Sequence, residues 1–487
     1  MNKLEFKKVV RMIVQSYQVK KYAHICITFA LMFFIRFIPP IDCITPLGME
    51  ILGIFIGTMY GWIFCGLIWP SLMALIMIGF SDYSTVGEIL SNAVGHQTVV
   101  FVLFLYIFCG VLEEAGISLA IGQRIANLKF AQGKPYILLS LLCFGAWLMG
   151  GLVSTVGSIL IFWQIFSNIC TQTNYNKNDL FPKLGTIGIL CSSVLGSTIF
   201  LFKLYPIIMM GIYSSITGET IDFIKFMVST SVVTLLLITV YLLFCKFILR
   251  PKTINDYVEL KKPEKFTSIQ LKMMGILIVL IFMFMIPSIF PANWWITKII
   301  SALGQNGTLV AILIMCFIIS DKGKPLIDIK NAINKGMSWE IYFLLFAIFQ
   351  LSDVMASDST GILDFIIKQM GGILGDKSPI IFCFLIIAIG GILSNVISNG
   401  VTPMIMIPLV VSYSAAIGIN PEVLLILLTI IMYNGIIFPS GSAFAGLLLA
   451  NEWIETIDVY KYGTLFVFIS IIIALFIGVP LVSVIMI

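Results

Sequence analysis

The chain has 487 residues, of which 59% are hydrophobic and 11% are charged, and its mean hydropathy is +1.06. A water-soluble protein of this length needs far more charge on its surface, so most of this surface must face lipid. The net charge of +5 comes from short segments between apolar runs and does not indicate nucleic-acid binding. Two histidines and ten cysteines without a CxxC pair argue against a zinc centre and a disulfide framework.

The apolar runs predict an all-α polytopic membrane protein in two halves. Residues 1–21 are basic and are expected to form a cytoplasmic segment. Arg36, Pro39 and Pro40 follow the first apolar run where a signal peptide would have a small-residue cleavage site, so the first span is expected to stay uncleaved. A first repeat over 22–250 and a second over 269–487 are joined by a polar linker, 251–268. About 11 transmembrane helices fit the apolar runs. They are expected near 22–40, 48–64, 66–80, 98–113, 184–213, 226–247, 270–290, 306–320, 338–356, 422–450 and 463–486.

Two further apolar stretches, 135–170 and 379–414, are too long for a single span and have a Gly-Gly pair near the middle. We expect each to be a re-entrant hairpin that dips into the membrane and returns, because non-helical backbone is tolerated there only inside protein or a wet cavity. Each hairpin precedes a span, 184–213 or 422–450, that Gly and Ser residues interrupt. We expect both of these spans to be broken helices.

The two hairpins contain a repeated motif, Gly150-Gly151-Leu152-Val153-Ser154 and Gly390-Gly391-Ile392-Leu393-Ser394. Most Lys and Arg residues fall on one side when the N-terminus and the ends of the first hairpin are cytoplasmic and the ends of the second are outside. The repeats are therefore predicted to be inverted. Interruptions at matching places of two inverted repeats indicate the binding site of a secondary transporter.

Three other interpretations compete with a carrier. Small residues can simply let membrane helices pack closely. A membrane enzyme would need a convergent His/Asp/Glu or Ser-Lys site, and no HExxH or GxSxG motif is present. A channel is disfavoured because the interrupted elements are two unequal copies and not a ring-forming motif.

These motifs resemble those of the divalent anion/sodium symporter family, the dicarboxylate, citrate and sulfate carriers of the ion-transporter superfamily. In that family each inverted repeat has a hairpin with a Ser-Asn-Thr tip, followed by a broken span. Ser154-Thr155-Val156 and Ser394-Asn395-Val396 match the tips, and Ser442 matches the Thr of the family's Pro-x-x-Thr loop. Thr155 replaces Asn, Val156 and Val396 replace Thr, and Ala443-Phe444-Ala445 replaces Pro-Pro-Asn, which marks a divergent member.

The resemblance implies a secondary active transporter, not an enzyme, for a small anion of the di- or tricarboxylate class. It implies coupling to Na⁺, a homodimer and an elevator-type movement. The protein is expected in the plasma membrane, in contact with membrane lipid and without a nucleic-acid partner. Sulfate, arsenite or cation/proton carriers of the same superfamily are the alternatives.

The resemblance also implies which residues form the sites. Sodium takes oxygen ligands, whereas helix N-termini at hairpin tips offer N–H donors to an anion. Expected substrate-binding residues are Thr155, Asn395, Ser442, Thr198, Asn399 and Lys203. The first sodium ion is expected at Ser154, Thr155, Gly196 and Ser197, and the second at Ser394, Asn395, Ser440 and Gly441.

Lys203 follows the first interrupted segment inside an apolar run, and a cation at that depth is costly and indicates function. It can face an anionic substrate, replace a sodium ion as a fixed charge in an anion exchanger, or extend to a lipid headgroup. Asp353 and the Glu113–Glu114 pair lie at predicted span ends, where capping or interfacial solvation is the simpler role.

Overall fold

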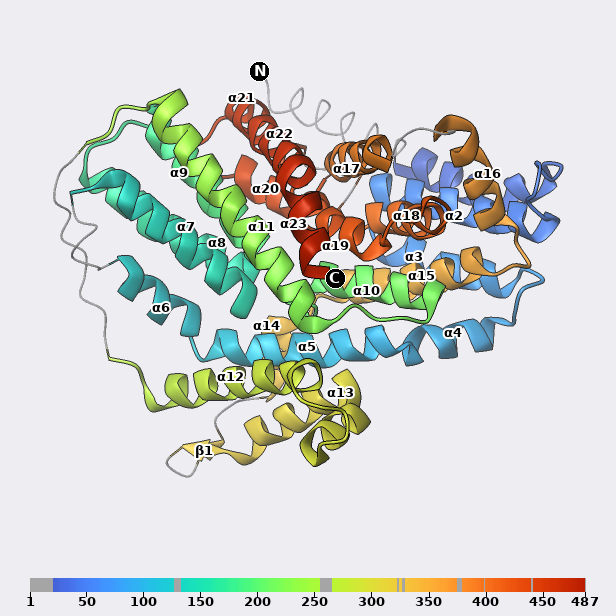
Figure 1. Ribbon diagram of the computed structural model, residues 1–487, viewed down its shortest axis with the longest axis horizontal. Helices are drawn as coiled ribbons and strands as arrows, with labels where there is room; N and C mark the ends of the chain where they lie inside the picture. Colours follow the sequence, from blue (N-terminus) through green and yellow to red (C-terminus); the bar gives the residue numbers. More distant parts are fainter. Residues whose placement is uncertain are drawn as a thin grey trace, which may run out of the picture. The chain divides into compact units, whose positions relative to one another are not determined.

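The computed structural model describes residues 21–126, 133–254, 265–321, 324–325, 329–374, 379–397, 399–438 and 441–486. Apart from loops, these residues are helical except for an antiparallel pair of two-residue strands, β1 (Ser320–Asp321) and β2 (Lys324–Pro325). The predicted all-α class is therefore confirmed for the described part of the chain, and Figure 1 shows the helices in chain order.

Eight of the described helices are long and apolar enough to cross a membrane. Shorter apolar helices accompany them, and all of these except Ile68–Gly79 belong to the second hairpin or to the two broken spans. A multi-pass membrane protein follows from this set of helices, as the composition predicts.

The described helices contact one another as two compact units, and the units do not follow the two repeats of the sequence. Unit 1 contains residues up to Val99, Ser214–Gly218 and Ser338–Asp376. Its described elements are helical residues 21–34, η1 (Ile35–Phe37), α2 (Pro46–Phe64), α3 (Ile68–Gly79), α4 (Val86–Gly95), α15 (Trp339–Ala356) and α16 (Ile362–Leu374).

Local sequence explains how α2 begins and how its start contacts the segment before α16. Thr45 begins α2 by accepting a hydrogen bond from the N–H of Gly48, with Pro46 at the first helical position. The Thr45 N–H donates to the carbonyl of Thr360, which lies before α16. Gly48 leaves room for that carbonyl, since a Cβ there would lie 2.0 Å from the Thr360 oxygen.

Unit 2 holds both predicted hairpins and both broken spans. Its first elements are α5 (Gln97–Glu114, from Val100 onward), α6 (Ile117–Ala126), α7 (Pro135–Leu152), α8 (Thr155–Gln172), α9 (Leu180–Gly196), α10 (Leu204–Thr217, up to Tyr213), α11 (Phe223–Phe244) and η3 (Cys245–Leu249). Then follow α12 (Ser268–Ile289), α13 (Trp295–Ile318), the two short strands and α14 (Ile329–Gly336). The last elements are α17 (Pro379–Val396), α18 (Thr402–Ile417), α19 (Pro421–Met432), α20 (Ala443–Leu449), α21 (Thr456–Asp458), η4 (Val459–Gly463), α22 (Thr464–Ile473), η5 (Ala474–Gly478) and α23 (Val479–Met486).

Each segment predicted as a hairpin or a broken span is a pair of helices in this unit, whereas re-entry into the membrane stays a prediction. The first hairpin is α7–α8, and the second is α17–α18. The first broken span consists of α9 and α10 with an interruption at 197–203, and the second consists of α19 and α20 with an interruption at 433–442. Figure 1 shows α7 and α8 beside α9, so the first hairpin packs along the first half of its broken span.

The structure departs from the sequence prediction at several short helices. The helices α4, α6, α14 and α16 are absent from the predicted spans because they are short and amphipathic, without a long apolar run. The helix α13 begins at Trp295 but consists of two helical stretches that meet at Gly304. Gly304, with φ 62° and ψ −171°, is not helical, so the second stretch begins close to residue 306, where the span 306–320 was predicted to start.

Candidate functional site

The tip of the first hairpin is a tight turn bonded to α9. Ser154 is the N-cap of α8, and its hydroxyl accepts a hydrogen bond from the Gly157 N–H at 3.2 Å. The carbonyl of Thr155 accepts a hydrogen bond from the Ser193 hydroxyl at 3.0 Å. The tip is therefore fastened to the last turn of α9, immediately before the first break.

Glycines bring the first hairpin and the first broken span into backbone contact. A Cβ on Gly150 would lie 2.2 Å from the carbonyl oxygen of Ser193, and one on Gly196 would lie 1.9 Å from that of Trp147. No side chain fits at such distances. Close packing, one of the alternatives that the sequence left open, is therefore a real role of Gly150 and Gly196.

The hydroxyl groups of the first break bond back to α9. Ser197 donates to the carbonyl of Val194 at 2.6 Å, and Thr198 donates to that of Leu195 at 2.8 Å. These bonds satisfy carbonyls at the end of a helix, which otherwise have no partner within it. Both side chains are buried beside the turn that leads to Lys203.

Lys203 reaches the first hairpin tip. Its ammonium nitrogen donates to the carbonyl of Val153, at 3.0 Å, and only 6% of the residue is exposed. The charge therefore lies inside unit 2 and does not extend to a lipid headgroup. Its electrostatic neighbours on α5 are Cys109 and Glu113, and a Cβ on Gly157 would lie 3.3 Å from a carboxylate oxygen of Glu113. Glu113 thus lies beside the first turn of α8.

The second hairpin tip is bonded to the second break through Asn395. Its amide nitrogen donates to the carbonyl of Gly391 at 2.9 Å, and its amide oxygen accepts from the Ile437 N–H at 3.0 Å. The Ser394 hydroxyl also donates to the Gly391 carbonyl, at 3.0 Å. Asn395 therefore joins the end of α17 to the loop between α19 and α20.

The backbone of the second break lies against the same tip. A Cβ on Gly435 would lie 2.6 Å from the Ser394 carbonyl oxygen, and one on Gly441 would lie 2.9 Å from the carbonyl oxygens of Ser394 and Asn395. The Asn399 N–H donates to the Gly441 carbonyl at 2.8 Å. Carbonyl oxygens thus gather where the second sodium ion is expected.

Ser442 closes the second break. Its hydroxyl donates to the carbonyl of Gly435 and accepts from the Ala445 N–H, so it caps α20 as Ser154 caps α8. Ser440, the remaining residue expected at the second sodium ion, lies outside the described residues. The structure thus brings Ser394, Asn395 and Gly441 together.

A cluster of tyrosines connects the two breaks. The Tyr205 hydroxyl donates to the side-chain oxygen of Asn399 at 2.6 Å, and its ring meets that of Tyr433 edge to face, with centroids 4.1 Å apart. Tyr433 also interacts with the Ser197 hydroxyl and with Tyr106 on α5. Residues from the first break, the second break and the second hairpin tip therefore form one polar and aromatic cluster.

Sequence reasoning placed Asn399 in the site but missed Tyr106, Tyr205, Tyr433 and the adjacent Asn434. Tyr205 follows Lys203 by two residues, and Tyr433–Asn434 comes directly after the end of α19. Polar and aromatic residues at the edges of a predicted break were the available signal. Tyr106 lies within an apolar helix and gave no such signal.

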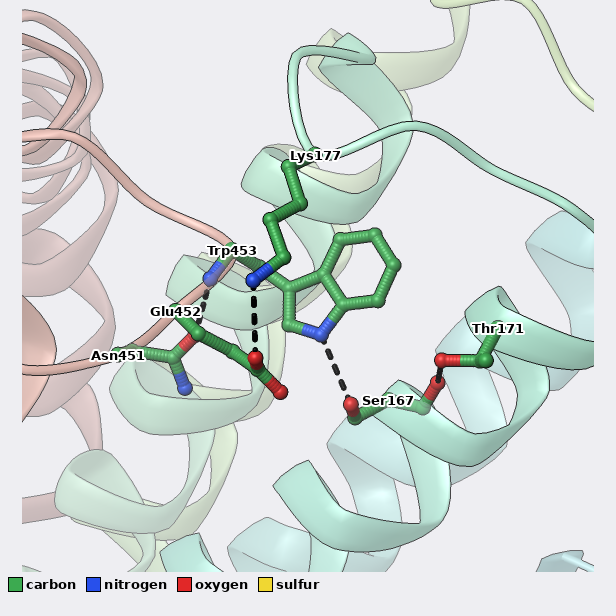
Figure 2. A network of polar contacts seen from close by, with 6 residues as sticks. All are labelled: Ser167, Thr171, Lys177, Asn451, Glu452 and Trp453. Carbon is green, nitrogen blue, oxygen red and sulfur yellow. Dashed lines mark hydrogen bonds and ion pairs between the residues drawn. The ribbon is translucent and has the colours of Figure 1, made fainter.

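The far end of the first hairpin has its own polar contacts, which Figure 2 shows. The Trp453 indole N–H donates to the Ser167 hydroxyl at 2.8 Å, and Lys177 pairs with Glu452 at 3.0 Å. Asn451 accepts from the Trp453 N–H through its side chain. The connection after α20 is therefore bonded to the end of α8 and to the loop that follows it.

A metal centre of the transition-metal type is not indicated by the described part of the chain, where no group of three His, Cys, Asp or Glu residues lies together. The oxygens near the tips are carbonyls, hydroxyls and amides, which suit a hard, weakly bound cation such as sodium.

The family model described as "Citrate transporter" (CitMHS) matches residues 59–431 and 306–486. The chain belongs to the citrate transporter family. This family is part of the ion-transporter superfamily, which confirms the relationship predicted from the hairpin motifs. The chain is therefore a membrane transporter.

Two solved transporters have a similar structure. YdaH of Alcanivorax borkumensis is 14% identical with a TM-score of 0.59, and the match covers 82% of this chain and 87% of that one. MtrF of Neisseria gonorrhoeae, which is described with a class of antimetabolite efflux pumps, is 14% identical with a TM-score of 0.56, covering 80% and 83%. At this identity the likeness establishes the fold alone. No curated protein matches the chain in sequence.

Proposed function

We propose that this member of the citrate transporter family is a secondary active transporter that moves a small di- or tricarboxylate anion together with sodium. The observation that carries the proposal is the buried ammonium group of Lys203 on the Val153 carbonyl. A buried cation beside the first hairpin tip and the first break attracts an anion and repels a cationic substrate, because the surroundings screen charge less than water does. The family description supports the carboxylate class.

Sodium is proposed to bind at the second hairpin tip. The carbonyls of Ser394 and Asn395 lie against Gly435 and Gly441, where no side chain separates them. At the first tip, the hydroxyls of Ser154 and Ser197 bond to the protein itself. Lys203 is proposed to replace the sodium ion expected there, so that one sodium site remains.

An anion exchanger is the second candidate. The same bond between Lys203 and Val153 favours it, because a charge that belongs to the protein replaces a coupling ion. In both cases the transporter is proposed to be a homodimer of the plasma membrane with a cytoplasmic N-terminus and an elevator-type movement. The distribution of Lys and Arg and the resemblance to sodium-coupled carriers support this arrangement.

Uptake into proteoliposomes tests the proposal. Purified protein in empty vesicles should accumulate labelled citrate or succinate when an inward sodium gradient is imposed, and should not do so when choline replaces sodium. Uptake that needs anion inside the vesicles and ignores sodium would instead establish exchange. Absence of uptake of citrate, succinate and malate under all of these conditions would refute carboxylate transport.

Asn395→Ala locates the sodium site within the same assay. The substitution removes the bonds to Ile437 and Gly391, so the sodium concentration for half-maximal uptake should rise roughly ten- to a hundredfold. Thr429→Val is the matched control, because Thr429 is buried in α19 and bonds only to the preceding turn. Equal sodium activation of Asn395→Ala and the control would move sodium away from this tip.

A further inference from the structure

Asn434 is a buried amide without a partner. It is 0% exposed, and neither its side-chain nitrogen nor its side-chain oxygen makes a hydrogen bond. Among the side-chain amides of the described residues, it alone has both atoms in this state. A buried polar group left unpaired costs about 1–3 kcal/mol, and both ends of this side chain carry that cost. A buried amide with both polar atoms unpaired is available to a bound molecule.

Asn434 lies in the second break, next in sequence to the tyrosine cluster. It is the second residue after α19, between Tyr433, whose ring meets Tyr205, and Gly435, which lies against the second hairpin tip. The Asn395 side chain, which bonds to the same break, has a partner at both ends of its amide, Gly391 and Ile437. Asn434 lies in the same break, but its side chain makes no hydrogen bond that holds the backbone in place.

Two more buried groups in this cluster lack partners. Tyr205 occupies the side-chain oxygen of Asn399 at 2.6 Å, which leaves the Asn399 amide nitrogen unpaired. The Tyr106 hydroxyl is also buried without a partner. The Asn399 nitrogen can only donate, the Tyr106 hydroxyl can donate or accept, and Asn434 can donate and accept through two separate atoms.

This set of groups selects a chemical class. Donors from Asn399 and Tyr106 suit carboxylate oxygens, which only accept. A donor and an acceptor on one amide suit a hydroxyl group, which accepts from the nitrogen and donates to the oxygen. We propose that Asn434 binds the hydroxyl group of the transported anion and selects it over anions that lack this hydroxyl, with Asn399 and Tyr106 on the carboxylate side of the anion. This inference rests on the proposed function and adds the source of its specificity.

The test compares pairs of anions that differ by one hydroxyl: citrate with tricarballylate, and malate with succinate. A site built to hydrogen-bond a hydroxyl rejects the analogue that lacks it, because its own polar groups then stay unpaired. The unmodified transporter should prefer the hydroxylated member of each pair in kcat/KM by roughly tenfold or more. Asn434→Leu keeps the branching of the side chain and removes both polar atoms. In this variant the kcat/KM values of the two members of each pair should differ by about threefold or less. The change should come mainly from loss of citrate and malate transport.

Thermal unfolding of the ligand-free protein separates a binding role from a structural one. Asn434→Leu should unfold at the same or a higher temperature, because replacing an unpaired buried amide by an apolar group removes its desolvation cost. If Asn434 instead served the fold, the substitution would lower the unfolding temperature. Thr429→Val is again the control and should leave both anion ratios unchanged.

Every outcome bears on the proposal. An Asn434→Leu variant that still prefers citrate and malate as the unmodified protein does would overturn it, as would an unmodified protein that transports both members of each pair equally well. If Asn434→Leu is poorly produced, Asn434→Ala answers the same question through its anion ratios. Failure of the unmodified protein to transport any of the four anions would refute the proposed function itself, which is a separate result.

Discussion

At the scale of single residues, Lys203 shows how a charge is held in an apolar chain. The sequence placed it past the first break, and the structure bonds its ammonium group to the carbonyl of Val153. An isolated buried ammonium group is expensive, and bonding to a hairpin carbonyl offsets part of that cost. Glu113 is an electrostatic neighbour of this charge, and the substrate anion is proposed to supply the rest of the compensation.

Replacement of Lys203 tests that role. Lys203→Ala should reduce uptake of the cognate anion by roughly a hundredfold, because a hydrogen-bonded charge is lost, whereas Lys203→Arg should retain part of it. Uptake is measured at matched amounts of protein in the membrane. Lys461→Ala, which removes an exposed lysine, is the control and should behave like the unmodified protein.

The residual activity of Lys203→Ala is also informative. If Lys203 stands in for a sodium ion, its removal frees the oxygens at the first tip, so residual uptake should depend more steeply on sodium concentration. Full uptake by Lys203→Ala would contradict both the anion-binding role and the replacement of sodium.

The positions of residues at the tips and breaks were predictable where a motif carried them. Asn395, Ser442 and Asn399 stood in recognisable places, and the structure shows each of them bonded at the second tip or break. Tyr106 and Asn434 were not predictable in this way. They stand out because their polar atoms are buried without a hydrogen-bond partner, and this can be seen only once the surrounding chain has folded.

At the scale of elements, the first hairpin and α9 form a close backbone contact. Gly196 approaches the Trp147 carbonyl so closely that a methyl group cannot fit. Gly196→Ala should therefore destabilise the protein by about 1–3 kcal/mol, because α7 and α9 must separate to admit the new methyl group. Thermal unfolding in detergent measures the effect as a lower midpoint.

Gly275→Ala is the matched control for this prediction. Gly275 lies inside α12, and a Cβ there would meet nothing within 4 Å. Alanine is the better helix former, so this variant should unfold at the same or a higher temperature. If Gly196→Ala were as stable as Gly275→Ala, the close approach of the two helices would be wrong.

The sequence predicted these elements unevenly. Hairpins and broken spans were predictable because glycines and serines interrupt runs that are otherwise apolar, and the structure has turns or loops at those places. The amphipathic helices α4 and α14 were missed, since their apolar residues repeat along one face and never form a long run. Length and hydropathy alone do not detect such helices.

At the scale of the whole molecule, the order of elements repeats: hairpin, broken span, long helix. The inversion of the second repeat stays a prediction that rests on the distribution of Lys and Arg. The structure adds that the two compact units each draw on both halves of the sequence. Hydropathy cannot predict this division, because it depends on contacts between segments far apart in the chain.

Cysteine labelling from the two sides of the membrane tests the inversion. A cysteine at Asn178, exposed in the loop after α8, should react with a membrane-impermeant reagent only from the cytoplasm. One at Asp376, which precedes the second hairpin and lies outside the described residues, should react only from outside. Both labelling variants should carry serine in place of the exposed Cys26 and Cys43, so that these native cysteines do not react. Labelling of both positions from the same side would exclude inverted repeats.

The bond between Lys203 and Val153 has an electrical consequence. A sodium ion leaves with the substrate, whereas an ammonium group that belongs to the chain stays when the anion has gone. Under the proposed movement, the empty carrier would take that charge back outward against the membrane voltage, at a cost of about 2.3 kcal/mol per 100 mV if it crossed the whole field. In the loaded carrier a dicarboxylate would balance the charges of Lys203 and of one sodium ion, so the loaded step would escape this cost. Membrane voltage would thus slow the empty return, which every transport cycle requires, and leave the loaded step nearly unaffected.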